Sequence, residues 1–160
     1  ARQITPRQGK VCVNRLVQEV VAFFQARLTE QSIKVQTRLG GSLPDLLADE
    51  SQIRQIIMNL CINAIHAMGK GGLLTIATQV RGGEIVLSVR DTGPGVPEEI
   101  RDKIFLPFFT TKDVAVGTGL GLSVVHGIVK SHRGRIKVVS NAGKGAEFKV
   151  YLPVTREQPL

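Results

Sequence analysis

Two pairs of alternating segments, each joined by a glycine-containing turn, constrain the fold more than any other feature. Residues 74–80 and 84–89 flank a turn at 81–83, and residues 136–140 and 146–152 flank a turn at 141–145. Alternation of apolar and polar side chains is typical of half-buried strands, and glycine at the turn predicts a hairpin. Neighbouring strands joined as hairpins are antiparallel, which argues against a purely parallel strand–helix–strand repeat.

Three other segments have apolar residues at helical spacing. The first runs from Asn14, a candidate N-cap, to about residue 31. The second begins at Asp49, which with Gln52 resembles a capping box, and ends at the glycines of 69–72. The third runs from about residue 119 to 132, and a short helix is expected at 97–100. With strands expected at 33–39 and 46–48, the pattern predicts an α+β two-layer sandwich with helices on one face of a mixed sheet.

The length of 160 residues is most simply one domain. Residues 1–10 are polar and are expected to be a linker, residues 11–155 to form the domain, and residues 156–160 to be a tail. No apolar run approaches the roughly 18–20 residues that span a bilayer. Cys12 and Cys61 lack metal-ligand spacing and are expected to be reduced thiols in a reducing compartment.

The net charge of +8 admits a nucleic acid, a membrane surface or an anionic small molecule as a partner. The basic residues are dispersed, however, with no run of three, and the chain has only seven aromatic residues. Nucleic-acid surfaces built on stacking usually have more of both, so this class is disfavoured.

The second expected helix has a polar stripe opposite its apolar face, formed by Gln52, Gln55, Asn59, Asn63 and His66. One interpretation is a solvated face, which is common in amphipathic helices. However, asparagine is a poor helix former, and Asn59 and Asn63 at i and i+4 present two amides to one spot. An amide oxygen is a hard ligand that suits Mg²⁺ held together with phosphates.

Two glycine clusters indicate a nucleotide site. The first, at 91–95, follows the end of an alternating run, and the second, at 117–122, precedes the third helix. Neither is a Walker A loop or a dinucleotide fingerprint. Backbone N–H groups at the start of a helix can bind a polyphosphate. Asp91 is either a turn former or an acceptor for an exocyclic amine such as that of adenine.

Taken together over 11–153, these segments resemble the ATP-binding catalytic domain of sensor histidine kinases, a branch of the GHKL superfamily. Residues 49–67 resemble the N box, 91–95 the first glycine box, 104–112 the F box, 117–122 the second glycine box and 143–148 the third. Several boxes in the right order make the resemblance specific. It implies the GHKL fold, a two-layer α/β sandwich with a mixed, mainly antiparallel sheet.

The resemblance also implies roles for single residues. Asn63 would coordinate Mg²⁺ with Asn59 beside it, Asp91 would accept a hydrogen bond from adenine, and 105–118 would be a mobile lid over ATP. Ala146 stands where a Ser or Thr is common. The implied catalytic residues are Asn59, Asn63 and Lys112. The implied ATP-binding residues are Asn59, Asn63, His66, Ala67, Asp91, Gly93, Gly95, Val96, Thr110, Thr111, Lys112, Gly117, Thr118, Gly119, Leu120, Gly121, Leu122 and Ala146.

The implied activity is transfer of the γ-phosphoryl group of ATP to a histidine on a separate phosphoacceptor and dimerisation domain. None of His66, His126 and His132 has the setting of a phosphoacceptor, so residues 1–10 are interpreted as the stub of the connection to that domain. The implied partners are ATP with Mg²⁺, the phosphoacceptor domain and a downstream response regulator. A cytoplasmic, monomeric domain without direct contact to nucleic acid or membrane is expected.

Asn59 occupies the position at which ATPases of the superfamily carry a glutamate that activates water. An amide cannot act as a general base, so slow hydrolysis is expected. The alternatives are a serine kinase or anti-sigma type of the same superfamily, a slow ATPase, and a non-catalytic nucleotide sensor or nucleic-acid binder.

Overall fold

A mixed five-stranded sheet forms one layer of the structure, a computed structural model that describes residues 8–107, 109, 121–140 and 143–154. Its strand order is β2 (Ile33–Arg38), β4 (Gly72–Arg81), β5 (Glu84–Arg90), β7 (Ala146–Pro153) and β6 (Arg135–Ser140). Strand β2 is parallel to β4, and the other three pairs are antiparallel. Both predicted hairpins, β4–β5 and β6–β7, are therefore confirmed.

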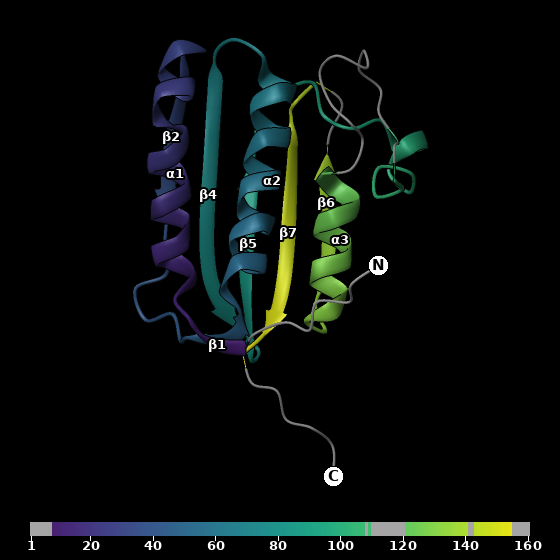
Figure 1. The fold of residues 1–160 in the computed structure, drawn as a ribbon. Coiled ribbons are helices and arrows are strands. Elements are labelled where there is room, and N and C mark those ends of the chain that lie inside the picture. The colour runs from purple at the N-terminus through teal and green to yellow at the C-terminus, as the bar shows by residue number, and fades with distance from the viewer. Residues whose placement is uncertain (1–7, 108, 110–120, 141–142, 155–160) are drawn as a thin grey trace.

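Three helices form the second layer and lie over the same face of the sheet (Figure 1). They are α1 (Val13–Glu30), α2 (Glu50–Met68) and α3 (Gly121–Ser131), and a short 3₁₀ helix, η1 (Glu98–Ile100), follows β5. Most of the apolar residues predicted at helical spacing are buried, among them Leu16, Ile53, Leu60 and Val129. The predicted α+β two-layer sandwich is confirmed. Among the described residues, no helix is long and apolar enough to cross a membrane.

A second, small sheet corrects the expectation for the start of the chain. Strand β1 (Gln8–Val11) pairs antiparallel with β3 (Leu46–Asp49), so residues 8–10 belong to a strand and not to a linker. Val11 and Leu46, which are opposite each other, are 1 % and 2 % exposed. Four residues are too few to show a clear alternation, and their pairing partner lies more than 30 positions away. Residues 1–7 and 155–160 lie outside the described residues.

The start of α1 also differs from the prediction. Cys12 is the N-cap and makes no side-chain capping bond, while Asn14 lies inside the helix. The Asn14 amide donates to the Gly40 carbonyl at 2.8 Å, and its oxygen accepts from the Thr78 hydroxyl at 2.6 Å. The same hydroxyl accepts from the Gly40 N–H at 3.0 Å. Asn14 thus joins α1 to β4 and to the loop after β2, and a tertiary contact replaces the predicted cap.

The predicted cap of α2 is half confirmed. The Asp49 carboxylate accepts from the Gln52 N–H at 3.2 Å, as in a capping box. The Asp49 N–H does not bond to Gln52 but donates to Nε2 of the buried His132, at 3.2 Å. His132 Nδ1 lies 2.9 Å from the Ile128 carbonyl, so the imidazole carries its proton on Nδ1. One histidine therefore ties the end of α3 to the start of α2.

Cys61 is part of the core, as expected for a thiol without chemical function. It lies on the apolar side of α2, 1 % exposed, and burial raises the pKa of its thiol to about 12. Cys12 is exposed, and both cysteines are free.

The substitution Thr78→Val tests the network of Asn14. Thr78 is 4 % exposed, and valine has a similar volume but cannot bond to Asn14 or to the Gly40 N–H. Because two partly buried groups lose their partner, the free energy of unfolding should fall by about 1–3 kcal/mol. Urea unfolding followed by circular dichroism measures the change. The control is Thr75→Val on the other face of β4, and equal stability of the two variants would contradict the assigned network.

Candidate functional site

The polar stripe of α2 is partly covered by the rest of the fold. Gln55, near the start of the helix, is exposed, whereas Asn59, Asn63 and His66 are half-buried. The Asn59 amide lies 3.4 Å from the carbonyl of Gly121, the first residue of α3. The stripe therefore lies beside the start of α3 at Asn59, and its second half is not a fully solvated face.

The first glycine turn is organised by a buried carboxylate. Asp91 is 2 % exposed, and its Oδ1 accepts from the Gly93 N–H at 2.8 Å and from the Ala146 N–H at 3.4 Å. The Asp91 N–H donates in turn to the Ala146 carbonyl at 2.9 Å. The role as turn former is confirmed. A buried carboxylate held by backbone donors is also a preorganised acceptor, as recognition of an adenine amine requires.

Two glycines allow this turn to pack closely against its neighbours. A Cβ on Gly93 would lie 2.9 Å from the Ala67 carbonyl oxygen, so the turn lies against the last residues of α2. Gly145 has a φ of +86°, and a Cβ there would lie 2.0 Å from the Asp91 carbonyl oxygen. A side chain fits at neither position. In Figure 1 the end of α2, the end of β5 and the start of β7 lie at the upper end of the sandwich, and α3 starts lower, beside the middle of α2.

Ser140 and Thr92 support the turn and were missed by the sequence analysis. The buried Ser140 hydroxyl accepts from the Val96 N–H at 2.7 Å and donates to the Gly145 carbonyl at 3.0 Å. The Thr92 hydroxyl accepts from the Leu73 N–H at 3.0 Å. A signal for Ser140 existed, because it shares the inward-facing parity of Ile136 and Val138 in the alternating segment. We found no comparable signal for Thr92.

The beginning of the F box is fixed to the core. Ile104 is 7 % exposed, and the Phe105 ring packs edge-on against Phe148 of β7, with 6.4 Å between centroids. Phe105 also lies 5.6 Å from the His126 ring of α3. His126 therefore has a packing role, and the segment that follows Phe105 starts from a defined position between α3 and β7.

Of the other residues implied by the resemblance, Gly95 has a φ of +84° in the first glycine turn, and Val96 and Leu122 are half-buried against the core. Ala146 is 5 % exposed, with its N–H and carbonyl both directed at Asp91. The remaining residues lie outside the described part of the chain: Thr110, Thr111, Lys112, Gly117, Thr118, Gly119 and Leu120.

The donor set of the described site suits a metal only together with an anionic ligand. Within the residues described, no group of three or more His, Cys, Asp or Glu is placed to hold a metal ion. Asn63 and Asn59 offer amide oxygens, which fit Mg²⁺ when phosphates and water complete its coordination. The site therefore fits Mg²⁺ bound with a nucleotide.

Comparison with known proteins agrees with this geometry. Residues 48–156 match the family model described as histidine kinase-, DNA gyrase B-, and HSP90-like ATPase. The chain is 38 % identical over 151 residues to the sensor histidine kinase ZraS of Escherichia coli strain K12, covering 93 % of this chain and 32 % of ZraS. It thus spans about a third of the length of this curated relative.

Solved structures show the same fold. The nucleotide-free catalytic domain of histidine kinase ThkA has a TM-score of 0.84 and 33 % identity, covering 92 % of this chain and 96 % of that domain. Full-length ShkA, solved in complex with AMPPNP, has a TM-score of 0.83 and 34 % identity, covering 100 % of this chain and 34 % of ShkA. The chain therefore belongs to the histidine kinase-, DNA gyrase B- and HSP90-like ATPase family, within which it corresponds to the catalytic domain of a sensor histidine kinase.

Proposed function

We propose that this domain binds ATP with Mg²⁺ and presents the γ-phosphoryl group to a histidine on a separate phosphoacceptor domain. The observation that carries the proposal is that α2 connects the segments of the candidate site: Asn59 lies beside the start of α3, and the Asp91 turn packs against Ala67 near the end of the helix. The Gly145 turn packs in turn against Asp91. The likeness to ShkA, a protein solved with AMPPNP, supports ATP as the nucleotide.

Asp91 binds the base in this proposal. Its Oδ1 is held by the N–H groups of Gly93 and Ala146, so the carboxylate is oriented before the nucleotide arrives. A preorganised acceptor loses little entropy on binding. Ala146 has no hydroxyl to offer and contributes through its backbone contacts with Asp91 and through packing.

Asn63 and Asn59 hold Mg²⁺ and the phosphates. When bound, Mg²⁺ would neutralise negative charge on the phosphoryl group that is transferred. Asn59 also lies against Gly121, so the metal-binding side of α2 is positioned next to the start of α3. The N–H groups at that helix start, together with His66, bind the phosphate oxygens.

The side chain of Asn59 determines the fate of the phosphoryl group. An amide cannot remove a proton from water at this position, so the nucleophile comes from another domain. Transfer then depends on positioning and charge neutralisation. A response regulator acts downstream. In support, ThkA, which matches this chain with a TM-score of 0.80 and 32 % identity, has been solved in complex with the response regulator TrrA. We place the domain in the cytoplasm as a monomer.

Phosphotransfer from labelled ATP tests the proposed function. The domain is incubated with Mg²⁺, γ-labelled ATP and a separately supplied phosphoacceptor domain of a sensor histidine kinase. We expect acid-labile, alkali-stable label on the acceptor and none on this chain alone. An acceptor with glutamine in place of its histidine is the control. Label on a serine, or ATP hydrolysis that is unchanged by the acceptor, would assign the domain to the serine-kinase or the ATPase branch.

The substitution Asp91→Asn tests recognition of the base. Asparagine keeps one oxygen for the Gly93 and Ala146 N–H groups but replaces the other with an amide donor that faces the adenine amine. We expect the affinity for ATP to fall by about 1–3 kcal/mol, measured by isothermal titration calorimetry. Asp45→Asn, at an exposed position before β3, makes the same change in charge. Unchanged affinity in Asp91→Asn would remove this residue from the site.

The substitution Asn63→Ala tests the metal. In the presence of Mg²⁺, we expect the affinity for ATP to fall by about tenfold or more, because an amide ligand is lost. In EDTA the variant and the unchanged protein should bind ATP alike. Gln55→Ala, one turn away from Asn59 on the exposed part of the stripe, is the matched control. A loss of the same size with and without Mg²⁺ would show that Asn63 is not a metal ligand.

A further inference from the structure

The face of the five-stranded sheet that points away from the helices is strongly basic. In β5, Ile85, Leu87 and Val89 are at most 1 % exposed under the helices, so the alternate residues, including Glu84 and Arg90, lie on the open face. The register of the pairs places the other residues of this face. Strands β2, β4 and β5 contribute Lys34, Arg38, Arg81 and Arg90.

The part of this open face formed by β7 and β6 is also basic. Strands β7 and β6 contribute Lys149, Arg135 and Lys137, and the acidic residues of the whole open face are Glu84 and Glu147. Seven basic residues against two acidic ones leave +5, more than half of the net charge of +8 of the entire chain. A solvated sheet face in a protein without a binding role usually mixes both signs.

Two lysines on this face are in an arrangement that does not favour folding. Lys137 of β6 is directly opposite Lys149 of β7. Like charges in this position are destabilising, whereas an opposite-charge pair would stabilise the sheet. Lys149 lies 4.0 Å from Glu147, a distance at the limit of an ion pair, and Lys137 lies 5.7 Å from the centre of the Tyr151 ring. The pair therefore retains positive charge that an external anionic group would neutralise.

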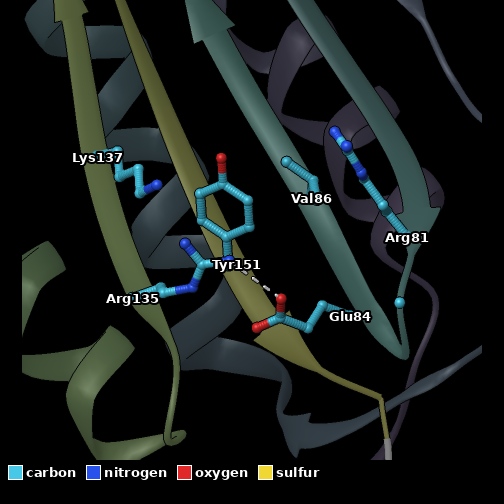
Figure 2. Close-up of a pocket in the computed structure, with 7 residues that line it drawn as sticks. Arg81, Glu84, Val86, Arg135, Lys137 and Tyr151 are labelled. Atoms are coloured by element: carbon cyan, nitrogen blue, oxygen red, sulfur yellow. Dashed lines mark hydrogen bonds and ion pairs between the residues drawn. The ribbon is translucent and has the colours of Figure 1, made fainter.

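The aromatic residue of this face is already engaged. The Arg135 guanidinium lies 3.8 Å from the centre of the Tyr151 ring and 3.3 Å from Glu84. Figure 2 shows Arg135 and Lys137 beside the ring, with Val86 and Arg81 across the hollow of about 410 Å³ that these residues line. A nucleobase would have to displace Arg135 to stack on Tyr151, which disfavours a single-stranded nucleic acid.

The order and spacing of the residues along one row of this face suit an extended chain. One row across the strands consists of Lys137, Lys149, Ser88, Ala77 and Arg38, each opposite the next. The middle of this row is occupied by small residues, and cations lie at both ends. Five strands spaced by about 4.8 Å make this row about 19 Å long. An extended peptide of about six residues has that length.

We propose that the open face of the sheet binds an acidic protein segment that runs across the strands. Its carboxylates pair with Lys137 and Lys149 at one end and with Arg38 at the other, and Ser88 and Ala77 leave room for its backbone. The exposed large hydrophobic residue of the face is Val139, 49 % exposed. One such residue offers little apolar area for insertion into a bilayer, which disfavours a membrane as the partner. The surface is on the opposite side of the sheet from the helices, and this proposal is independent of ATP binding.

Titration of a fluorescein-labelled hexaglutamate peptide with the domain, followed by anisotropy at low salt, tests the proposal. For Lys137→Glu/Lys149→Glu we expect binding to be weaker by about tenfold or more, because two contacting charges are reversed. The control is Lys10→Glu/Lys130→Glu, which changes net charge equally at exposed positions of β1 and α3. The control variant should lose much less affinity for the peptide than Lys137→Glu/Lys149→Glu. Added salt should weaken the binding of the unchanged protein.

Several outcomes would overturn the proposal. One is that hexaglutamate fails to bind, and another is that the control variant weakens binding as much as Lys137→Glu/Lys149→Glu does. Oligothymidylate or phosphatidylserine vesicles that bind more tightly than hexaglutamate, and lose binding equally in Lys137→Glu/Lys149→Glu, would assign the face to nucleic acid or to membrane. The single variant Lys137→Glu tests whether weaker peptide binding results from misfolding. It should raise the melting temperature, because it forms an opposite-charge pair with Lys149, and still weaken peptide binding. ATP affinity should be unchanged in every variant.

Discussion

The close approach of Gly145 to the backbone of Asp91 is the contact on which the candidate site depends. With a side chain at position 145, the start of β7 could not pass the end of β5 at this distance. The approach lets the Ala146 N–H reach the Asp91 carboxylate, and Ser140 bonds to Gly145 and Val96 on the other side. A buried carboxylate is costly without such partners, so the turn, the hairpin and Asp91, which is proposed to recognise the base, form one unit.

Helix α2 links this unit to the rest of the site, because its two sides have different tasks. The apolar side forms the core against the sheet, and the polar side carries the asparagines. Helix α3 contacts α2 at both of its ends: Gly121 lies beside Asn59, and His132 bonds to Asp49. The position of the start of α3, where the phosphates are proposed to bind, is therefore set by contacts at the opposite end of the helix as well.

The two faces of the sheet also have different roles. The helices cover one face, and the other carries the positive charge that is proposed to bind an acidic segment.

Much of the fold could be predicted from the sequence because its signals are local. Alternation on both sides of a glycine turn indicated β4–β5 and β6–β7, and Asp49 followed by an apolar period indicated α2. Asn59, Asn63 and Asp91 could be selected by spacing and by the resemblance to the kinase boxes. The structure places Asn59 beside the start of α3 and the Asp91 turn against Ala67 near the end of α2, while the roles of these residues toward ATP and Mg²⁺ stay predictions. Lys112 and the glycines at 117 and 119 lie outside the described residues.

The sequence by itself determined the helices and the strands other than β1, which faces are apolar and which residues are expected to carry the chemistry. Only the tertiary structure decided where Asn14 bonds, that residues 8–10 form a strand with β3, and that His132 completes the cap at Asp49. It also decided that Lys137 faces Lys149. The physical reason is the range of the interactions. Helix periodicity and turn geometry act over a few residues, whereas these bonds and registers join positions that become neighbours only when the helices and the sheet pack together.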